Sequence, residues 1–137
     1  MQKQLPLNKT DFGYIRRNNL LYVDKTQAIH KLTMNGGFYL LARPRGFGKS
    51  LLISTLKALF AGNKELFEGL WIYQQKRDWE PYPVIHLPFA SMDYTQKGLV
   101  NALNEMLIET AEDHHITLKY RNPAENFQQL IRSIPSK

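Results

Sequence analysis

The chain has 137 residues, of which 43% are hydrophobic, and its formal net charge is +6. This length suits one domain, and the apolar content excludes a chain that is disordered throughout. The sequence contains no cysteine, which excludes a disulfide framework and a zinc site built on thiolates. The basic balance favours anionic partners such as nucleotides, nucleic acid or acidic membrane, but the scattered lysines and arginines do not choose among them.

The N-terminal sequence carries no apolar core of signal-peptide length, and no stretch approaches the length of a transmembrane helix. We therefore expect a cytoplasmic protein without a membrane partner.

The first predicted elements follow an irregular segment over residues 5–17. Residues 20–23 are apolar and predict a short strand that ends at Asp24. Asp24 and Gln27 have the spacing of a capping box, so a helix is expected after Asp24 and should end near Gly36. Four apolar residues before an aspartate also resemble a Walker B element, but this one precedes the phosphate loop described next, and a helix cap is the favoured interpretation.

Residues 37–50 contain the most informative pattern. An apolar run of strand length enters a loop rich in glycine and arginine, and Gly48-Lys49-Ser50 then opens a segment with apolar residues at helical spacing, up to about residue 60. The order is strand, loop, helix, which is the order of the phosphate-binding loop in P-loop NTPases.

The chemistry of phosphate binding explains these residue types. Backbone N–H groups of the loop and the positive end of the helix dipole can surround phosphate oxygens, and Gly48 allows the backbone to come close. Lys49 can reach the β- and γ-phosphates, and the Ser50 hydroxyl can bind Mg²⁺. We predict ATP and Mg²⁺ as ligands. The predicted binding residues are Arg43, Pro44, Arg45, Gly46, Phe47, Gly48, Lys49, Ser50 and Leu51, with Ser50 as the metal ligand.

The loop departs from the usual spacing, in which a glycine stands five residues before the Gly-Lys-Ser triplet. Arg43 occupies that position. A plain helix start with a solvated lysine is the alternative, but the strand before the loop, the apolar helix after it and the two arginines favour a phosphate loop.

The second half of the chain continues the alternation of strands and helices. Residues 63–70 predict a short helix, and residues 82–89 predict an edge strand because prolines lie near both ends. A helix is expected from about residue 94 to 113. The two histidines that follow it, His114 and His115, are interpreted as part of a polar helix end rather than as a metal site. A last helix should begin at Asn122, followed by Pro123.

Three stretches together resemble the AAA-ATPase-like family: residues 22–26 (YVDKT), 43–51 (RPRGFGKSL) and 82–87 (YPVIHL). Residues 64–70 also resemble a family stretch, and the likeness covers about residues 5–107. The resemblance implies a prokaryotic P-loop ATPase with an α/β fold of three α/β/α layers, of which residues 1–137 would form the N-terminal portion. Family members often carry a restriction-nuclease-like domain, so that domain or the rest of the ATPase is an expected partner.

Two departures from the family pattern matter. Gly46 stands where the family usually has a further arginine, and no acidic Walker B strand follows Lys49. We therefore expect a partial fold truncated before the Walker B strand, with the strand before the loop left open-edged. We also expect little or no hydrolysis by the chain alone, since losing a catalytic carboxylate costs about 10²–10⁴ in rate. Whether the chain is an enzyme stays open at this point.

Two other functions remain as alternatives. A non-enzymatic nucleic-acid-binding module would use Arg16, Arg17, Arg43 and Arg45 on phosphate backbones, although no aromatic residues alternate with them in a recognisable pattern. A truncated gene product without independent activity would show no nucleotide binding.

Overall fold

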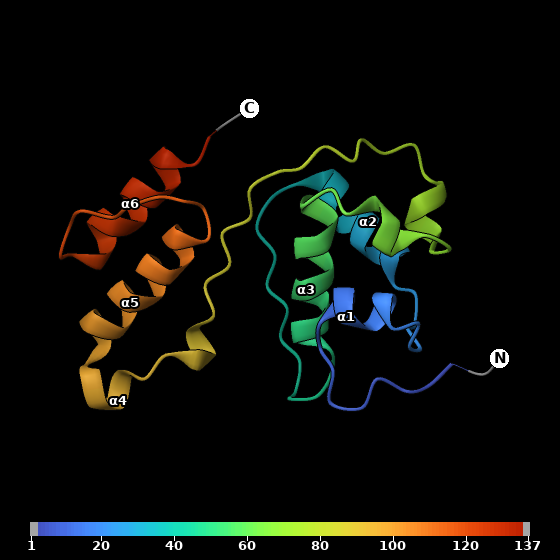
Figure 1. Cartoon of the computed structure of the whole chain (residues 1–137), viewed down its shortest axis with the longest axis horizontal. Coiled ribbons are helices and arrows are strands. Elements are labelled where there is room, and N and C mark those ends of the chain that lie inside the picture. The colour runs from blue at the N-terminus through green and yellow to red at the C-terminus, as the bar shows by residue number, and fades with distance from the viewer. Residues whose placement is uncertain (1–2, 136–137) are drawn as a thin grey trace. The chain divides into compact units, whose positions relative to one another are not determined.

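The computed structural model of the protein describes residues 3–135, which fall into two units, Met1–Tyr82 and Pro83–Lys137. Figure 1 labels the α-helices of both units, α1 to α3 in the first and α4 to α6 in the second. The first unit carries α1 (Phe12–Arg17), α2 (Thr26–Asn35), α3 (Lys49–Phe60) and the 3₁₀ turns η1 (Lys64–Phe67) and η2 (Trp71–Gln74).

The core of the first unit is aromatic. Phe12 on α1 and Phe67 on η1 are fully buried, with their ring centroids 4.8 Å apart. Tyr22 meets Phe12 edge-on at 5.1 Å, and Trp79 lies 5.3 Å from Phe67. Buried aliphatic side chains of α3 such as Leu59 complete the cluster. This core fixes α3, the helix that follows the predicted phosphate loop.

The Asp24 side chain links the start of α2 to the start of η2. One carboxylate oxygen accepts hydrogen bonds from the Thr26 amide at 2.8 Å and the Thr26 hydroxyl at 2.6 Å, and the other accepts from the Trp71 amide at 2.7 Å. Partial burial acts to raise the pKa of Asp24, but these hydrogen bonds outweigh it, so the pKa lies below the ordinary value of 3.8. Asp24 therefore binds the first residue of α2, but Lys25 occupies the N-cap position without a side-chain cap. Gln27 makes no capping-box bond within the described residues, so the predicted capping box is wrong.

The second unit carries η3 (Phe89–Ser91), α4 (Tyr94–Lys97), α5 (Leu99–Glu112) and α6 (Pro123–Ser133). Leu107 and Ala111 of α5 pack on Leu130 of α6. The Asn122 side chain accepts a hydrogen bond from the Ala124 amide, so the predicted cap of the last helix is confirmed. The single helix predicted from residue 94 to 113 is wrong, because Gly98 at φ +77° separates α4 from α5.

The predicted α/β fold is also wrong for the described residues. No strand or sheet occurs in residues 3–135, so the three α/β/α layers are not seen. The segments predicted as strands, residues 20–23, 37–41 and 82–89, run without a ladder. Isolated backbone bonds join the Leu20 amide to the Ile15 carbonyl at 3.0 Å, the Leu21 amide to the Gln4 carbonyl at 2.8 Å and the Tyr82 amide to the Phe60 carbonyl at 2.6 Å. A strand is stable only beside a paired neighbour, and these segments find none in the part of the chain that the structure describes.

No described helix combines the length and the apolar character needed to cross a lipid bilayer.

Candidate functional site

The predicted phosphate loop is an exposed bend between an extended run and α3. Gly46 has φ +85° and Gly48 has φ +81°, a backbone region that side-chain-bearing residues rarely adopt. A Cβ atom added at either glycine would meet nothing within 4 Å. The glycines are therefore required here for backbone conformation and not for space.

The first turn of α3 presents unused backbone donors. The helix begins at Lys49 directly after Gly48, no side chain caps it, and its first hydrogen bond runs from the Leu52 amide to the Gly48 carbonyl at 2.9 Å. The amides of Lys49, Ser50 and Leu51 have no acceptor among the described residues. These donors and the helix dipole together give this end of α3 a partial positive charge.

The Lys49 side chain turns back over the loop. Its ammonium donates to the Arg43 carbonyl at 2.5 Å and to the Pro44 carbonyl at 3.0 Å. An ammonium has three donors, so one remains for another acceptor. Of the predicted binding residues, the structure thus brings Arg43, Pro44 and Lys49 into direct contact.

The remaining cations and the aromatic residue of the loop are exposed. Arg43 and Arg45 form no ion pair within the described part of the chain, and the Phe47 side chain is 67% exposed. The Ser50 hydroxyl has no hydrogen-bond partner among residues 3–135, whereas Leu51 is half-buried against the aromatic cluster. The loop therefore combines a fixed helix start with exposed polar groups.

The apolar run before the loop is also exposed. Phe38 is 108% and Leu40 is 95% exposed, and Tyr39 and Leu41 are exposed as well. The Tyr39 hydroxyl donates to the Gly36 carbonyl at 2.7 Å. Since this run has no paired neighbour, nothing in the described residues fixes the beginning of the loop as firmly as α3 fixes its end.

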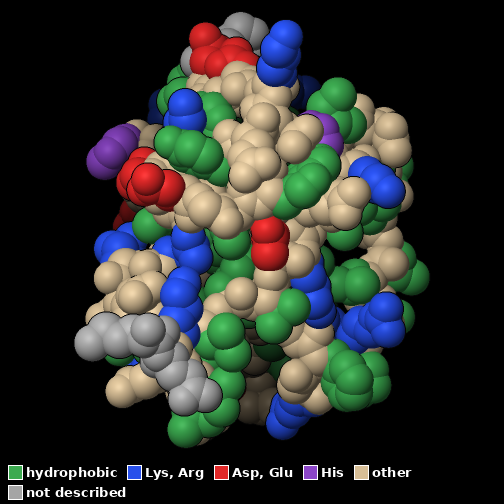
Figure 2. Space-filling model, turned by 90° about the vertical axis from the view of Figure 1, so that its right-hand side faces the viewer, with side chains coloured by type: hydrophobic (Ala, Val, Ile, Leu, Met, Phe, Trp, Pro, Cys, Tyr) green, Lys and Arg blue, Asp and Glu red, His purple; other side chains and the backbone are tan. Residues whose placement is uncertain are grey.

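One basic residue outside the loop has a structural role. Figure 2 shows Lys and Arg side chains spread over one face of the molecule, with hydrophobic and other side chains between them. Arg16 is engaged structurally, because its guanidinium donates to the Leu66 carbonyl at 2.7 Å and to the Glu68 carbonyl. Of the residues of the nucleic-acid alternative, Arg16 is thus committed to carbonyl groups of the first unit.

One polar contact near α3 was not predicted from the sequence. The Ser54 hydroxyl lies 3.3 Å from the Asp11 carboxylate and accepts a hydrogen bond from the Phe12 amide at 2.8 Å. Asp11 precedes Ser54 by 43 residues, so no local pattern signals the contact. The four-residue spacing of Ser50 and Ser54 was the signal available, since it places both on one face of a helix.

No group of three or more His, Cys, Asp or Glu side chains within residues 3–135 could hold a metal ion. A Mg²⁺ ion brought by a nucleotide needs no such cluster, because it takes most of its ligands from phosphates and water. One exposed serine oxygen beside a helix start fits that requirement.

Comparison with known proteins gives two matches. Residues 6–137 match the AAA-ATPase-like family, described as predicted AAA-ATPases. The chain is also similar to a protein of Azotobacter chroococcum mcd 1 named as an uncharacterized protein in the vnfD 5′ region, with 36% identity over 134 residues. That match covers 96% of this chain and 26% of the relative, so the chain spans about a quarter of the relative's length. No solved structure matches the chain.

Proposed function

The chain belongs to the AAA-ATPase-like family of predicted AAA-ATPases, and on this premise we propose that residues 43–51 bind the phosphates of ATP. The observation that carries the proposal is the start of α3, where three consecutive amides lack acceptors beside a loop with three cationic side chains. Such donors, at the positive end of a helix dipole, are suited to phosphate oxygens.

Lys49 supplies the compact charge of the site. Its contacts with the Arg43 and Pro44 carbonyls hold the ammonium against the loop, so the charge is in place before a nucleotide arrives. In this proposal the third ammonium donor binds a β- or γ-phosphate oxygen, and Arg43 and Arg45 add attraction for the polyphosphate.

Ser50 is the residue that would hold Mg²⁺. When bound, the ion neutralises charge on the phosphates. Turnover requires a carboxylate that orients water, and no acidic strand follows Lys49 in residues 51–137. The proposed activity of this chain is therefore nucleotide binding with little or no hydrolysis, and the rest of an ATPase or a nuclease-like domain is the proposed partner.

The test compares Lys49→Ala with Lys57→Ala, which removes an exposed lysine from the same helix. Equilibrium ATP binding is measured by calorimetry in Mg²⁺, and folding is checked by circular dichroism. We expect Lys49→Ala to weaken ATP binding by at least about 10-fold, the cost of about 1.4 kcal/mol of lost interaction, and Lys57→Ala to leave it unchanged. Equal binding by both variants, or none by the unmodified chain, would contradict the proposal.

A further inference from the structure

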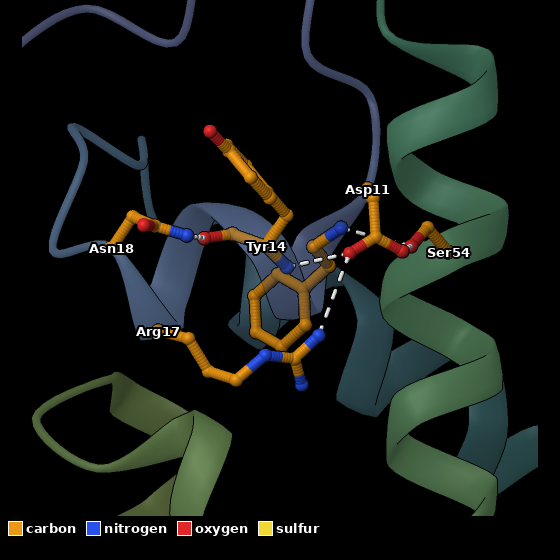
Figure 3. A network of polar contacts seen from close by, with 6 residues as sticks. Asp11, Tyr14, Arg17, Asn18 and Ser54 are labelled. Atoms are coloured by element: carbon orange, nitrogen blue, oxygen red, sulfur yellow. Dashed lines mark hydrogen bonds and ion pairs between the residues drawn. The ribbon is translucent and has the colours of Figure 1, made fainter.

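Asp11 reaches the helix that begins at the phosphate loop. Figure 3 shows its carboxylate between the start of α1 and the side of α3. One oxygen accepts from the Tyr14 amide at 2.5 Å and the other lies 3.3 Å from the Ser54 hydroxyl. The Phe12 amide donates to that same hydroxyl at 2.8 Å, so α1 is fixed to α3 at this point.

Ser54 lies one helical turn beyond Ser50. Residues four apart lie on the same face of an α-helix, and one turn rises about 5.4 Å. The Asp11 carboxylate is therefore held beside the face of α3 that carries the Ser50 hydroxyl, the group proposed to bind Mg²⁺. A negative charge reaches this face from a segment that precedes the loop in the sequence.

We propose that Asp11 accepts a hydrogen bond from a water molecule of the Mg²⁺ ion held by Ser50, an inference that rests on the proposed function. Mg²⁺ binds oxygen at about 2.1 Å and keeps several of its waters, and a water-to-carboxylate hydrogen bond adds about 2.8 Å. The path from the Ser50 oxygen through the ion and one water thus spans up to about 7 Å. It has to cover the rise of about 5.4 Å from Ser50 to Ser54 and the 3.3 Å between the Ser54 hydroxyl and the Asp11 carboxylate, which lies to the side of α3.

The carboxylate has capacity for this contact. The Asp11 side chain is 64% exposed, and an ionised carboxylate can accept about four hydrogen bonds. The described residues supply two donors, the Tyr14 amide and the Ser54 hydroxyl, with the Arg17 guanidinium at 4.0 Å. Asp11 would thus provide an acidic group near the ion in a chain where no Walker B aspartate follows Lys49.

The test separates the charge of Asp11 from its capping role. Asparagine caps helices as well as aspartate does, so Asp11→Asn should keep α1 in place while removing the charge. ATP affinity is measured for both forms with Mg²⁺ and with a chelator. Losing a group beyond the direct ligands typically weakens metal binding about 10- to 100-fold, so we expect Asp11→Asn to weaken ATP binding about 10-fold in Mg²⁺ and not in chelator.

The matched control is Asp78→Asn, which makes the same charge change at an exposed aspartate of the first unit. Equal Mg²⁺ dependence in the two variants would overturn the inference and leave the proposed function standing. No ATP binding by the unmodified chain would overturn the proposed function itself. Thermal unfolding verifies the fold, and Asp11→Ser, which also caps, replaces the first variant if asparagine fails to fold.

A double variant sharpens the result. If Ser50 and Asp11 act on one ion, Ser50→Ala and Asp11→Asn together should weaken Mg²⁺-dependent binding by less than the product of their single effects. Multiplicative effects would contradict a shared ion.

Discussion

The starts of α3 and α5 are alike in two respects and differ in their surroundings. Each helix follows a glycine of positive φ, Gly48 at +81° and Gly98 at +77°, and neither has a side-chain cap. At α5 the cation directly before Gly98 in the sequence, Lys97, is paired with Glu105 at 2.8 Å. At α3 the loop cations Arg43 and Arg45 have no acidic partner within the described residues. The proposed anion site at α3 therefore rests on the unpaired cations beside an uncapped helix start, a combination that the start of α5 lacks.

The support beneath the two helices also differs. Leu59 of α3 is 1% exposed within a cluster of eight buried residues, whereas Leu107 of α5 is 3% exposed within a cluster of three. We expect Leu59→Ala to cost about 3–4 kcal/mol of unfolding free energy and Leu107→Ala about 2–3, because the larger core relaxes less around a cavity. Chemical denaturation of each variant checks the order, and a larger loss for Leu107→Ala would contradict it.

The start of α2 provides the next contrast, because the Asp24 carboxylate accepts hydrogen bonds from Thr26 there and from Trp71. An asparagine at position 24 cannot accept at both side-chain atoms, so Asp24→Asn leaves the Thr26 or Trp71 amide without its acceptor. We expect a loss of about 1–3 kcal/mol at neutral pH. Because folding lowers the pKa of Asp24, its contribution is present above about pH 4 and disappears as the pH falls through the lowered pKa.

The unfolding free energies of the unmodified chain and of Asp24→Asn, measured between pH 7 and pH 2, test this pH dependence. The gap between the unmodified chain and Asp24→Asn should narrow below pH 4. A gap that stays constant with pH would show that the charge of Asp24 does not stabilise the fold. Asp78→Asn is the control, since asparagine can still accept from the Glu80 amide.

The two glycines give the smallest expected effects. Gly48 lies in the left-handed helical region with ψ 15°, where alanine costs about 1–2 kcal/mol. Gly98, with ψ 153°, lies in a region restricted to glycine, where strain reaches about 3 kcal/mol. We expect Gly98→Ala to be the more destabilising in thermal unfolding, and Gly48→Ala alone to weaken ATP binding. Weakened binding in Gly98→Ala would contradict the contrast between the two helix starts.

Local signals in the sequence predicted part of this molecule. Asn122 marked the start of α6 and Gly36 the end of α2, because caps act through backbone groups within a few residues. Gly98 was missed as a break, although residues 95–97 are polar and the apolar stripe that predicted the helix begins only at Leu99. The strand predictions failed because a run of apolar residues, such as 37–41, indicates only that extended backbone is favoured locally. A sheet also needs partner strands elsewhere in the chain, which the run itself does not indicate.

The candidate site was also predicted only in part. The Gly-Lys-Ser triplet located the loop and the start of α3, and the contacts of Lys49 with the Arg43 and Pro44 carbonyls agree with a cation held at the loop. Nucleotide binding stays a prediction. The approach of Asp11 to Ser54 could not be predicted, because it depends on the packing of Phe12 in the aromatic core.

The most direct measurement follows backbone amide resonances by NMR while ATP and Mg²⁺ are added. If the loop wraps a polyphosphate, amide shifts should concentrate at residues 46–51, and the amides of residues 99–101 at the matched start of α5 should stay unchanged. Equal shifts at both helix starts, or none at residues 46–51, would contradict the account.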